Sequence, residues 1–478
     1  MTSDFSYQRK SRPGRWSPAI AVLVWVGGAA SGEVDGPSST PARPGYKSFR
    51  FDEDFSALAD PTLRTQPLDD LKYIPLGDEP RTWLTLGGEA RTRYEYFNEP
   101  GFGLRGLSKD DFVLQRLLFH ADLHVGDHFR VFAQSVSAWQ IDPESATSPL
   151  QDDALDVQQA FADVVIGDPR GDRLLLRGGR MEMGFGSFRL VTPRDPTNVR
   201  LNFDGVRATL HLGQATIDAF LTRPVEQKRG IFNDGENDAQ TFWGVYSSVP
   251  IDGPALNLDA YYLGLRRENA RFDAGSGTDE RHSLGARAWG RAGGFDYDLE
   301  GVFQFGDFAG RSIRAWTVAS NVGHTWEQAA WKPRLGIKAN IASGDTDRAD
   351  SREGTFYALF PRQSYFSEIN LLAPSNFFDL HPSFQVRPSE SLLITASWDP
   401  FWRYTENDGV YGPGRVAIPA SATSGRFVGS TIDLQADWTL TPQLTMSAFY
   451  AHFFAGEAVS KAGGKSADFF GTWVTYKF

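Results

Sequence analysis

The sequence contains no cysteine, and after its first thirty-one residues it has no long apolar run. Without cysteine, neither disulfide bonds nor a lipid-modified N-terminal cysteine can form. Nothing after residue 31 approaches the roughly 20 apolar residues that a membrane-spanning helix needs. The 59 acidic and 48 basic residues give a net charge of −11, which argues against a nucleic-acid partner. Disulfide-stapled scaffolds and helical membrane proteins are therefore excluded.

Catalytic and metal-binding motifs are also missing. The sequence has no Gly-x-Ser-x-Gly elbow, no His-Glu-x-x-His pair and no phosphate loop. His120 and His124 are four residues apart, but in a strand this spacing does not form the helix-face pair of a zinc site. Acidic runs around Asp153, Asp234 and Asp345 could hold Ca²⁺ weakly, but they match no calcium-loop spacing, which favours solvated loops. We therefore expect no catalytic residues, no cofactor and no metal.

The N-terminal segment has the parts of a secretory signal peptide. Basic residues precede an apolar core over 16–26, and small residues follow over 27–31. The core is too short for a single membrane anchor, so we expect residues 1–30 to be a signal peptide cleaved near Ala30. Residues 31–82 are proline-rich and charged without clear periodicity. We interpret them as a periplasmic lead-in, too short for the globular plug of the largest barrels.

From Trp83 to Phe478 the dominant pattern is alternation with period two. In 84–96 one face carries apolar or small side chains, and the other carries Thr85, Glu89, Arg91, Arg93 and Glu95. A soluble β-sandwich also has alternating strands. However, several segments here alternate for ten residues or more, whereas soluble strands usually run about 5–6. The length of the alternation therefore favours strands that cross a membrane.

About eighteen segments show this alternation, an even number in the range of bacterial barrels. Short turns alternate with long polar gaps along the chain, and only the connection 307–310 is short where a long one is due. A sandwich has no reason to place a long loop at every second connection. We therefore predict an all-β fold: a transmembrane antiparallel β-barrel over 83–478, with short periplasmic turns and long extracellular loops. The predicted strands are 83–98, 110–125, 128–141, 156–166, 172–183, 203–212, 214–223, 241–249, 256–265, 281–292, 295–306, 311–325, 330–343, 376–387, 391–403, 427–440, 443–454 and 469–478.

The last predicted strand gives a second signal. Phe470, Thr472, Val474, Tyr476 and Phe478 share one face. An amphipathic final strand that ends in an aromatic residue is typical of proteins inserted into the bacterial outer membrane. The expected location is therefore the outer membrane, as an integral protein in contact with lipid after cleavage of the signal peptide.

In such a barrel the apolar face contacts lipid and the polar face lines the lumen, because Arg or Lys facing lipid at the bilayer midplane costs about 2–4 kcal/mol. A barrel this wide is not filled by its own wall side chains, so we expect a channel. Two interpretations of the lumen stay open: a wall in which Arg and Asp pair, or unpaired arginines that guide an anionic solute. The alternation places these cations in the lumen: Arg91, Arg93, Arg116, Arg281, Arg287, Arg334, Lys338, Arg387 and Arg403.

The gap 184–202 is unusually basic. It contains Arg189, Arg194 and Arg200, with Asp195 as its only acid. Folded into the lumen, this segment would form a basic constriction; lying outside, it would be a solvated loop. The sequence does not choose between these placements, and we include the three arginines among the candidate pathway residues.

A series of short motifs runs in order from about Phe49 to the end of the chain: 49–55, 71–76, 86–95, 176–180 with Glu182, Gly186 and 189–190, 198–200, 203–207, 230–234, 242–246, 343–345, 379–382, 402–403 and 408–411. In these motifs the sequence resembles the alginate-export family of outer-membrane proteins. The resemblance implies an eighteen-stranded barrel in which an arginine-rich lumen passes a polyuronate. It adds Arg180 and Arg207 to the candidate lumen residues, with Arg180 in a Gly-Arg-Met sequence where the family motif usually has Gln in place of Met.

The expected function is passive conduction of solutes, not catalysis. The leading specific role is export of an anionic, alginate-like polysaccharide. One alternative is a general uptake porin for small organic acids or sugars, and another is a surface receptor or adhesin that acts through its long loops. A barrel lipase or protease would need a Ser/His or Asp/His set at the rim, and we can assemble none. The expected partners are an anionic saccharide or small anionic solute; whether a periplasmic export partner docks is open.

Overall fold

A computed structural model describes residues 43–77 and 81–478. The predicted signal peptide lies outside the described residues, as does the first part of the predicted lead-in. The rest of the lead-in carries four short 3-10 helices before the first long strand.

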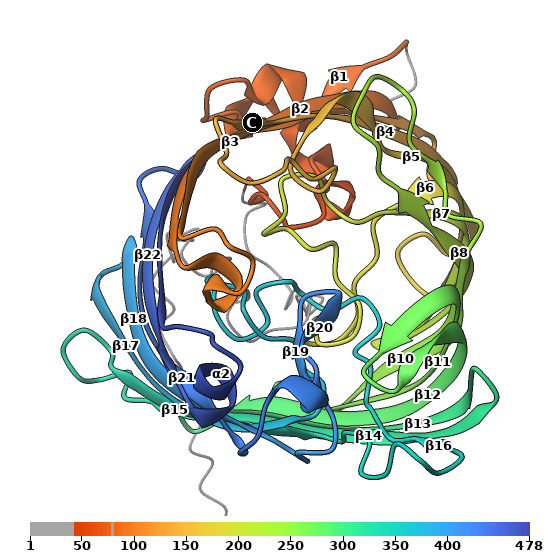
Figure 1. Cartoon of the computed structure of the whole chain (residues 1–478). Helices are drawn as coiled ribbons and strands as arrows, with labels where there is room; N and C mark the ends of the chain where they lie inside the picture. The colour runs from red at the N-terminus through yellow and green to blue at the C-terminus, as the bar shows by residue number, and fades with distance from the viewer. Residues whose placement is uncertain (1–42, 78–80) are drawn as a thin grey trace, which may run out of the picture.

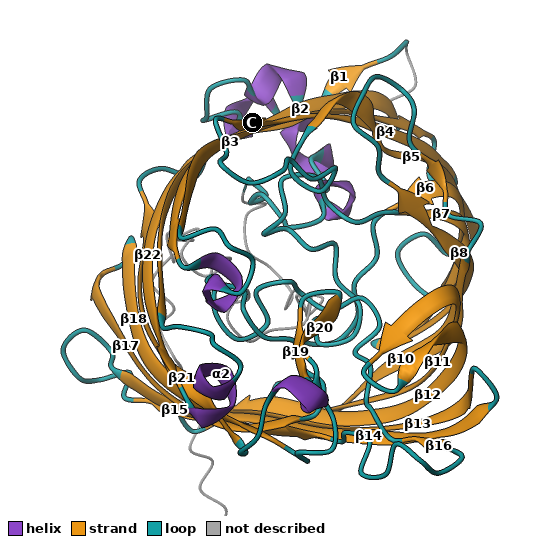
Figure 2. Ribbon diagram, viewed as in Figure 1, coloured by secondary structure: helices purple, strands orange, loops and turns teal. Residues whose placement is uncertain are grey.

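Eighteen long strands form a closed antiparallel barrel (Figures 1 and 2). Each strand pairs with the next along the chain, and the last pairs with the first, with Ala90 opposite Tyr476. The predicted fold class and strand number are confirmed. The strands are β2 (Thr82–Asn98), β3 (Lys109–Val125), β4 (Phe129–Ile141), β5 (Asp153–Gly167), β6 (Arg173–Met181), β7 (Phe203–Leu212), β8 (Ala215–Glu226), β10 (Gln240–Asp252), β11 (Leu256–Phe272), β12 (Gly275–Ala292), β13 (Phe295–Phe308), β14 (Arg311–Thr325), β15 (Arg334–Ala342), β17 (Phe377–Ser389), β18 (Leu392–Arg403), β21 (Phe427–Thr439), β22 (Leu444–Ala455) and β23 (Ala467–Lys477).

The remaining elements are short. Among the described residues, no helix is long and apolar enough to cross a membrane. The helices are η1 (Arg50–Asp52), η2 (Ser56–Ala59), η3 (Pro61–Leu63), η4 (Asp69–Leu71), η5 (Pro100–Gly103), η6 (Ala420–Ala422) and α2 (Glu457–Lys461). The short strands are β1 (Ile74–Pro75), β9 (Gly235–Glu236), β16 (Arg352–Glu353), β19 (Val410–Gly412) and β20 (Arg415–Ile418).

Alternation along each strand decides which side chains face lipid. On β13, Leu299 and Phe303 are 45% and 49% exposed on the outer face, whereas Asp298 and Glu300 are buried on the inner face. A lipid-facing position carries no water to solvate a charge, so the apolar residues occupy it and the carboxylates turn inward. The inner surface is therefore polar wherever the strands alternate.

The connections alternate as predicted between a short-turn end and a long-loop end of the barrel. There are two exceptions at the long-loop end: the tight turns 273–274 and 309–310. We predicted that one strand ends at 265 and the next begins at 281, whereas β11 ends at Phe272 and β12 begins at Gly275, with a turn at 273–274 between them. Residues 266–280 are charged on both faces, as expected for a hairpin that projects beyond the apolar band, so they give no alternation signal. At the short-turn end, β15 begins at Arg334 and not at 330, because 326–333 form a turn.

The apolar core lies inside the barrel. Phe203 on β7, Phe242 on β10 and Phe360 on a long loop are buried in one cluster, with ring centroids 5.0–5.8 Å apart. Side chains from two wall strands and one loop therefore share this core, and the packing fixes the loop within the lumen.

Candidate functional site in the barrel lumen

Ion pairs link the strands on the inner surface of the barrel wall. Arg287 on β12 bridges its two neighbouring strands: its Nη1 lies 2.7 Å from Asp259 Oδ2, and its Nη2 lies 2.7 Å from Asp298 Oδ2. Arg334 of β15 reaches across β14 to pair with Asp296 of β13, at 2.6 Å. Paired charges of this kind lock the wall and leave little net field for a solute.

The basic loop 182–202 crosses the lumen. Near one end, Arg189 Nη1 lies 2.7 Å from Asp298 Oδ1 and 2.8 Å from Glu300 Oε2, both on β13. Near the other end, Asp195 Oδ1 accepts from Arg116 Nη2 of β3 at 2.9 Å. β13 stands nine strands from β3 in either direction around the ring. The loop therefore spans the full width of the barrel. Of the two placements that the sequence left open, inside the lumen or outside it, the structure shows the one inside.

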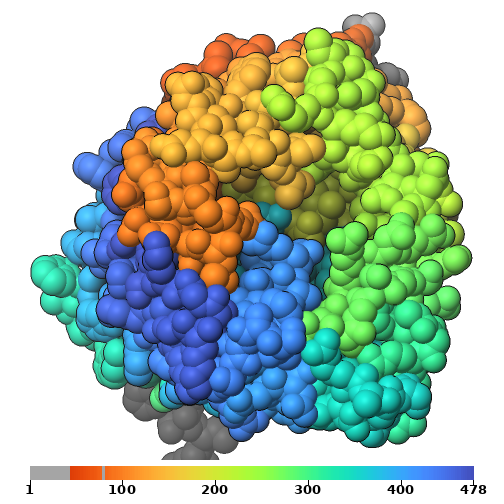
Figure 3. Space-filling view, viewed as in Figure 1, coloured from red at the N-terminus to blue at the C-terminus, as the bar shows by residue number. Residues whose placement is uncertain are grey.

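A second loop, 343–376, pairs with the first inside the barrel. Val191 and Phe360 form a parallel β-bridge between the two loops. The second loop reaches the wall where Glu368 Oε2 lies 3.2 Å from Arg93 Nη2 of β2, and where Ser367 Oγ donates to Asp433 of β21 at 2.6 Å. Figure 1 shows these loops, coloured yellow and cyan, across the centre of the ring. In the space-filling view, the opening at the centre of the ring is narrowed to a hollow (Figure 3).

The N-terminal segment occupies the lumen near the short-turn end. The Phe51 ring lies 6.2 Å from that of Phe132 and 5.5 Å from that of Phe161, both on the inner wall. Arg50 donates to the carbonyl oxygens of Gly88 and Phe478, each at 2.8 Å. The described part of the lead-in is thus packed into the barrel by aromatic contacts and hydrogen bonds, so the lumen is narrowed from both ends.

Thirteen of the fourteen candidate cations lie inside the barrel, and Arg180 does not. Strand register pairs Met181 with Phe203, both buried on the inner side, which turns Arg180 and Asp204 to the outer face with the 57% exposed Val206. Arg180 is held there by a two-pronged ion pair with Asp204, at 2.8 and 2.9 Å. The assignment of Arg180 to the lumen was wrong because the family motif carries no information on strand register.

Ten of the thirteen lumen cations make ion pairs. Among the residues that the structure describes, Arg194, Lys338 and Arg387 make none within 4.0 Å. The paired cations are Arg91, Arg93, Arg116, Arg189, Arg200, Arg207, Arg281, Arg287, Arg334 and Arg403. The paired-wall interpretation therefore describes most of this set.

Arg194 is the exception within the crossing loop. Its Nε donates to the Pro361 carbonyl oxygen at 3.2 Å, and neither terminal nitrogen bonds to any described residue. The residue is half-buried and has φ +56°, a conformation that side-chain-bearing residues seldom adopt. Backbone strain of this kind persists only where the surrounding structure enforces it, and it often marks a binding element. Arg194 is thus held in the lumen with its charge available.

Acids and bases outside the strands have shifted pKa values. Burial raises the pKa of Glu182 to about 7, even though Arg200 lies 2.9 Å away and opposes the rise. Burial disfavours ionisation of Asp195 as well, but Arg116, Arg200 and Arg91 hold its pKa well below the usual value. Burial and the charge of Arg50 lower the pKa of Lys72 to about 7. Two groups near the lumen therefore change charge around neutral pH.

Sequence reasoning missed part of the lumen. Arg177 pairs with Asp163 at 2.8 Å, and its guanidinium carbon lies 3.8 Å from the centre of the Phe161 ring. Its position on β6 alternates with outward Leu176, a signal that could have found it. Glu368 could not have been found, because a loop without periodicity says nothing about which wall residue it meets.

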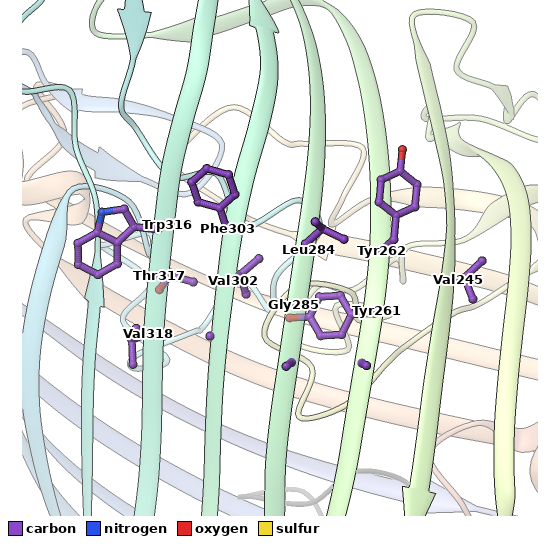
Figure 4. Close-up of a pocket in the computed structure, with 13 residues that line it drawn as sticks. Val245, Tyr261, Tyr262, Leu284, Gly285, Val302, Phe303, Trp316, Thr317 and Val318 are labelled. Atoms are coloured by element: carbon purple, nitrogen blue, oxygen red, sulfur yellow. The ribbon is translucent and has the colours of Figure 1, made fainter.

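The outer surface also has a hollow, of about 720 Å³ (Figure 4). It lies over the outward-facing Ala260, Ala286 and Gly301, and larger apolar side chains such as Leu284 and Phe303 rim it. These two side chains are 51% and 49% exposed on the lipid-facing side. The hollow is therefore not part of a route through the barrel.

The family model for alginate export matches residues 82–472. The chain belongs to the alginate export family. The match covers the barrel from its first strand into its last, and it confirms the resemblance seen in the sequence motifs. Members of this family are channel-forming barrels, and the chain is accordingly an integral outer-membrane barrel. A comparison with curated proteins finds no match.

Solved structures of Pseudomonas aeruginosa porins have the same fold. OccK2 (OpdF) is similar at a TM-score of 0.57 and 11% identity, over 83% of this chain and 97% of that chain. OccD3 (OpdP) is similar at 0.57 and 12%, over 83% and 91%. OccK2 in complex with glucuronate is similar at 0.56 and 11%, over 85% and 98%. At such low identity, the likeness shows the barrel fold alone.

Proposed function

We propose that this family member is a passive outer-membrane channel for carboxylated saccharides, with export of an alginate-like polyuronate as its specific role. The observation that carries the proposal is the crossing loop 182–202, which holds the unpaired Arg194 inside the lumen. An arginine fork matches a carboxylate in two-pronged geometry. A carboxylate of the solute can therefore form with Arg194 the ion pair that no carboxylate of the protein forms.

The paired arginines support passage beyond this first contact. Arg189 is shared between Asp298 and Glu300, and Arg93 is shared between Glu95 and Glu368. A carboxylate of the solute can replace one of the two protein carboxylates while the arginine keeps its ion pair with the other. Such exchange is weak and repeated, which conduction requires, because a tightly held polymer would not leave.

Uptake of small organic acids or sugars is the second candidate. The narrowing of the lumen by two loops and the N-terminal segment favours it, since a small solute needs less space than a polymer. One of the solved porins of similar fold was crystallised with glucuronate. Both candidates share the same anion contact, and they differ in whether a chain of linked uronates can thread the lumen.

The test is single-channel recording of the purified barrel in a planar bilayer under a salt gradient. We expect a reversal potential on the anion-selective side, block by oligouronates, and no block by neutral oligosaccharides of equal length. Arg194→Gln should remove most of the block, whereas Arg352→Gln, the same change at an exposed residue, should not. If the duration of each block increases with every uronate unit added to the oligomer, the result supports threading of a polymer. Block by monouronates alone favours uptake, and indifference to all uronates overturns the proposal.

A further inference from the structure

Three carboxylates that are far apart in sequence converge at the rim of the long-loop end. Asp153 and Asp156 belong to the start of β5, and Asp234 belongs to the loop that follows β8. One carboxylate oxygen from each lies within 4.8 Å of the others. The sequence favours solvated acidic loops here, because neither segment alone has the spacing of a calcium loop. Only the fold brings the two segments together.

The backbone fixes this convergence. Leu155 forms a parallel β-bridge with Ile231, and the Phe232 amide donates to the Leu155 carbonyl oxygen at 2.9 Å. The amides of Asn233 and Asp234 then donate to Asp156 Oδ2, at 2.8 and 3.0 Å. The loop 227–234 therefore lies along β5 with its carboxylate already oriented, and the arrangement does not depend on flexible side chains.

Asp153 points to a ligand. It is fully buried, and neither of its carboxylate oxygens accepts a hydrogen bond; the Gly230 amide approaches without reaching hydrogen-bond geometry. A buried carboxylate with no donor is costly, because its charge has lost water and gained nothing in exchange. A bound cation would supply the missing partner, and the oxygens of Asp153 lie close to those of two other carboxylates.

The surrounding basic residues do not supply that cation. Arg180 Nη1 is 3.7 Å from Asp156, but the fork of Arg180 is occupied by Asp204. Lys228 pairs with Glu226, and Arg229 pairs with Asp152. Apart from the long contact of Arg180 with Asp156, these cations are paired with other acids, and the three carboxylates keep an excess of negative charge.

From this geometry we infer that Asp153, Asp156 and Asp234 form a site for a hard divalent cation, Ca²⁺ in preference to Mg²⁺. All three ligands are oxygens, the donors that Ca²⁺ takes, and no histidine is among them. Two oxygens on opposite sides of Ca²⁺ at about 2.4 Å are about 4.8 Å apart. The three carboxylates, with one oxygen of each within 4.8 Å of the others, are therefore close enough to bind one ion. Mg²⁺ demands a tighter octahedron and sheds its water reluctantly. The bound ion would fasten the loop 227–239 to the start of β5.

The experiment is calorimetric titration of the folded full-length barrel, freed of divalent ions, with CaCl₂ and separately with MgCl₂. We expect one saturable Ca²⁺ site per chain and weaker binding of Mg²⁺. Asp153→Asn and Asp234→Asn should each weaken Ca²⁺ binding roughly tenfold or more. The matched control is Asp238→Asn, an exposed acid of the same loop that pairs with Arg223 and should bind as the wild type does.

A second readout protects the test against misfolding. Trypsin cleavage after the exposed Arg229 should be slowed by Ca²⁺ in the wild type and in Asp238→Asn, but not in Asp234→Asn. If Asp153→Asn fails to give the compact heat-modifiable band of a folded barrel, Asp234→Asn carries the test. No saturable binding in the wild type overturns the inference. Equal binding by the wild type and by folded Asp153→Asn and Asp234→Asn also overturns it.

Discussion

Asp195, the only acid between residues 184 and 202 of the crossing loop, accepts from Arg116 of β3 at 2.9 Å, and the two residues are 79 positions apart in sequence. The Asp195 backbone oxygen also accepts from Arg91, at 3.0 Å. Arg200 approaches the same carboxylate at 3.6 Å. One loop carboxylate therefore lies within ion-pair distance of three lumen arginines and ties the loop to β2 and β3.

Asp195→Asn should increase anion selectivity. The substitution leaves the arginines around it with less compensating charge, and it weakens the attachment of the loop to the wall. We expect a reversal potential shifted further to the anion-selective side and noisier open-channel current, measured in a planar bilayer. Asp238→Asn, at an exposed loop position, is the control. An unchanged reversal potential in Asp195→Asn would show that Asp195 does not shape the pathway.

Arg189→Gln should loosen the other end of the loop. Removing one partner of a buried ion pair costs about 3–5 kcal/mol. Here the cost should fall below that range, because Asp298 keeps Arg287 and Glu300 keeps the Tyr261 hydroxyl at 2.6 Å. We expect a lower heat-modifiability midpoint on gels and a shift toward cation selectivity. Arg348→Gln, at a more exposed position outside the lumen set, should change neither measurement.

Anion selectivity should rise as pH falls from about 8 to about 6. Below the pKa of Glu182, about 7, the acid is neutral and no longer compensates Arg200; below the pKa of Lys72, also about 7, the lysine is charged. Both changes make the lumen more positive at lower pH. Reversal potentials across this pH range measure the effect. Glu182→Gln should fix its own contribution at the low-pH value and so flatten the profile; a profile that keeps its full slope would rule out Glu182 as a titrating group.

The same group makes a prediction for stability. The folded-state pKa of Glu182 lies above its unfolded value, so the unfolded chain loses this proton first as pH rises. Its contribution to the free energy of unfolding is therefore present below pH about 4.5 and declines as pH rises through about 7. Comparing the heat-modifiability midpoints of the wild type and Glu182→Gln at pH 6 and pH 8 measures it. The variant should lose less stability between these two values than the wild type does.

Phe51→Ala should release the N-terminal segment from the lumen. The Phe51 ring packs against Phe132 and Phe161 with the Arg177 guanidinium 4.3 Å from its centre. Truncating a buried phenylalanine costs about 3–5 kcal/mol. We expect larger single-channel conductance and faster proteolysis of the segment 43–55, with the barrel itself still folded. Leu68→Ala, at an exposed position further along the described lead-in, is the control. Equal conductance in both variants would mean that the segment does not limit flow.

The sequence predicted the barrel well, and the reason is local. On β13, Asp298 and Glu300 alternate with Leu299 and Phe303, and each side chain has only two faces to choose from. The lipid boundary imposes that choice on every strand, so the pattern repeats and can be counted. It failed at 266–280, where the hairpin extends past lipid and both faces can be polar, and at Arg180, whose face depends on register.

The candidate site was only half predictable. Residue type and alternation placed Arg116 and Arg287 in the lumen, but nothing local states that Arg116 meets Asp195 or that Arg287 meets Asp259. Loops have no period, and their partners lie on other strands. The choice between a paired wall and free arginines therefore depends on contacts across the lumen.

By itself, then, the sequence determined the membrane, the fold and the strand number, because a hydrocarbon boundary acts on every second residue. Tertiary structure alone decided where the loop 182–202 lies, why Arg194 is the unpaired loop arginine, and that Asp153 and Asp234 meet at the rim. Those outcomes follow from ring closure, which brings chain segments together at distances that no local pattern encodes.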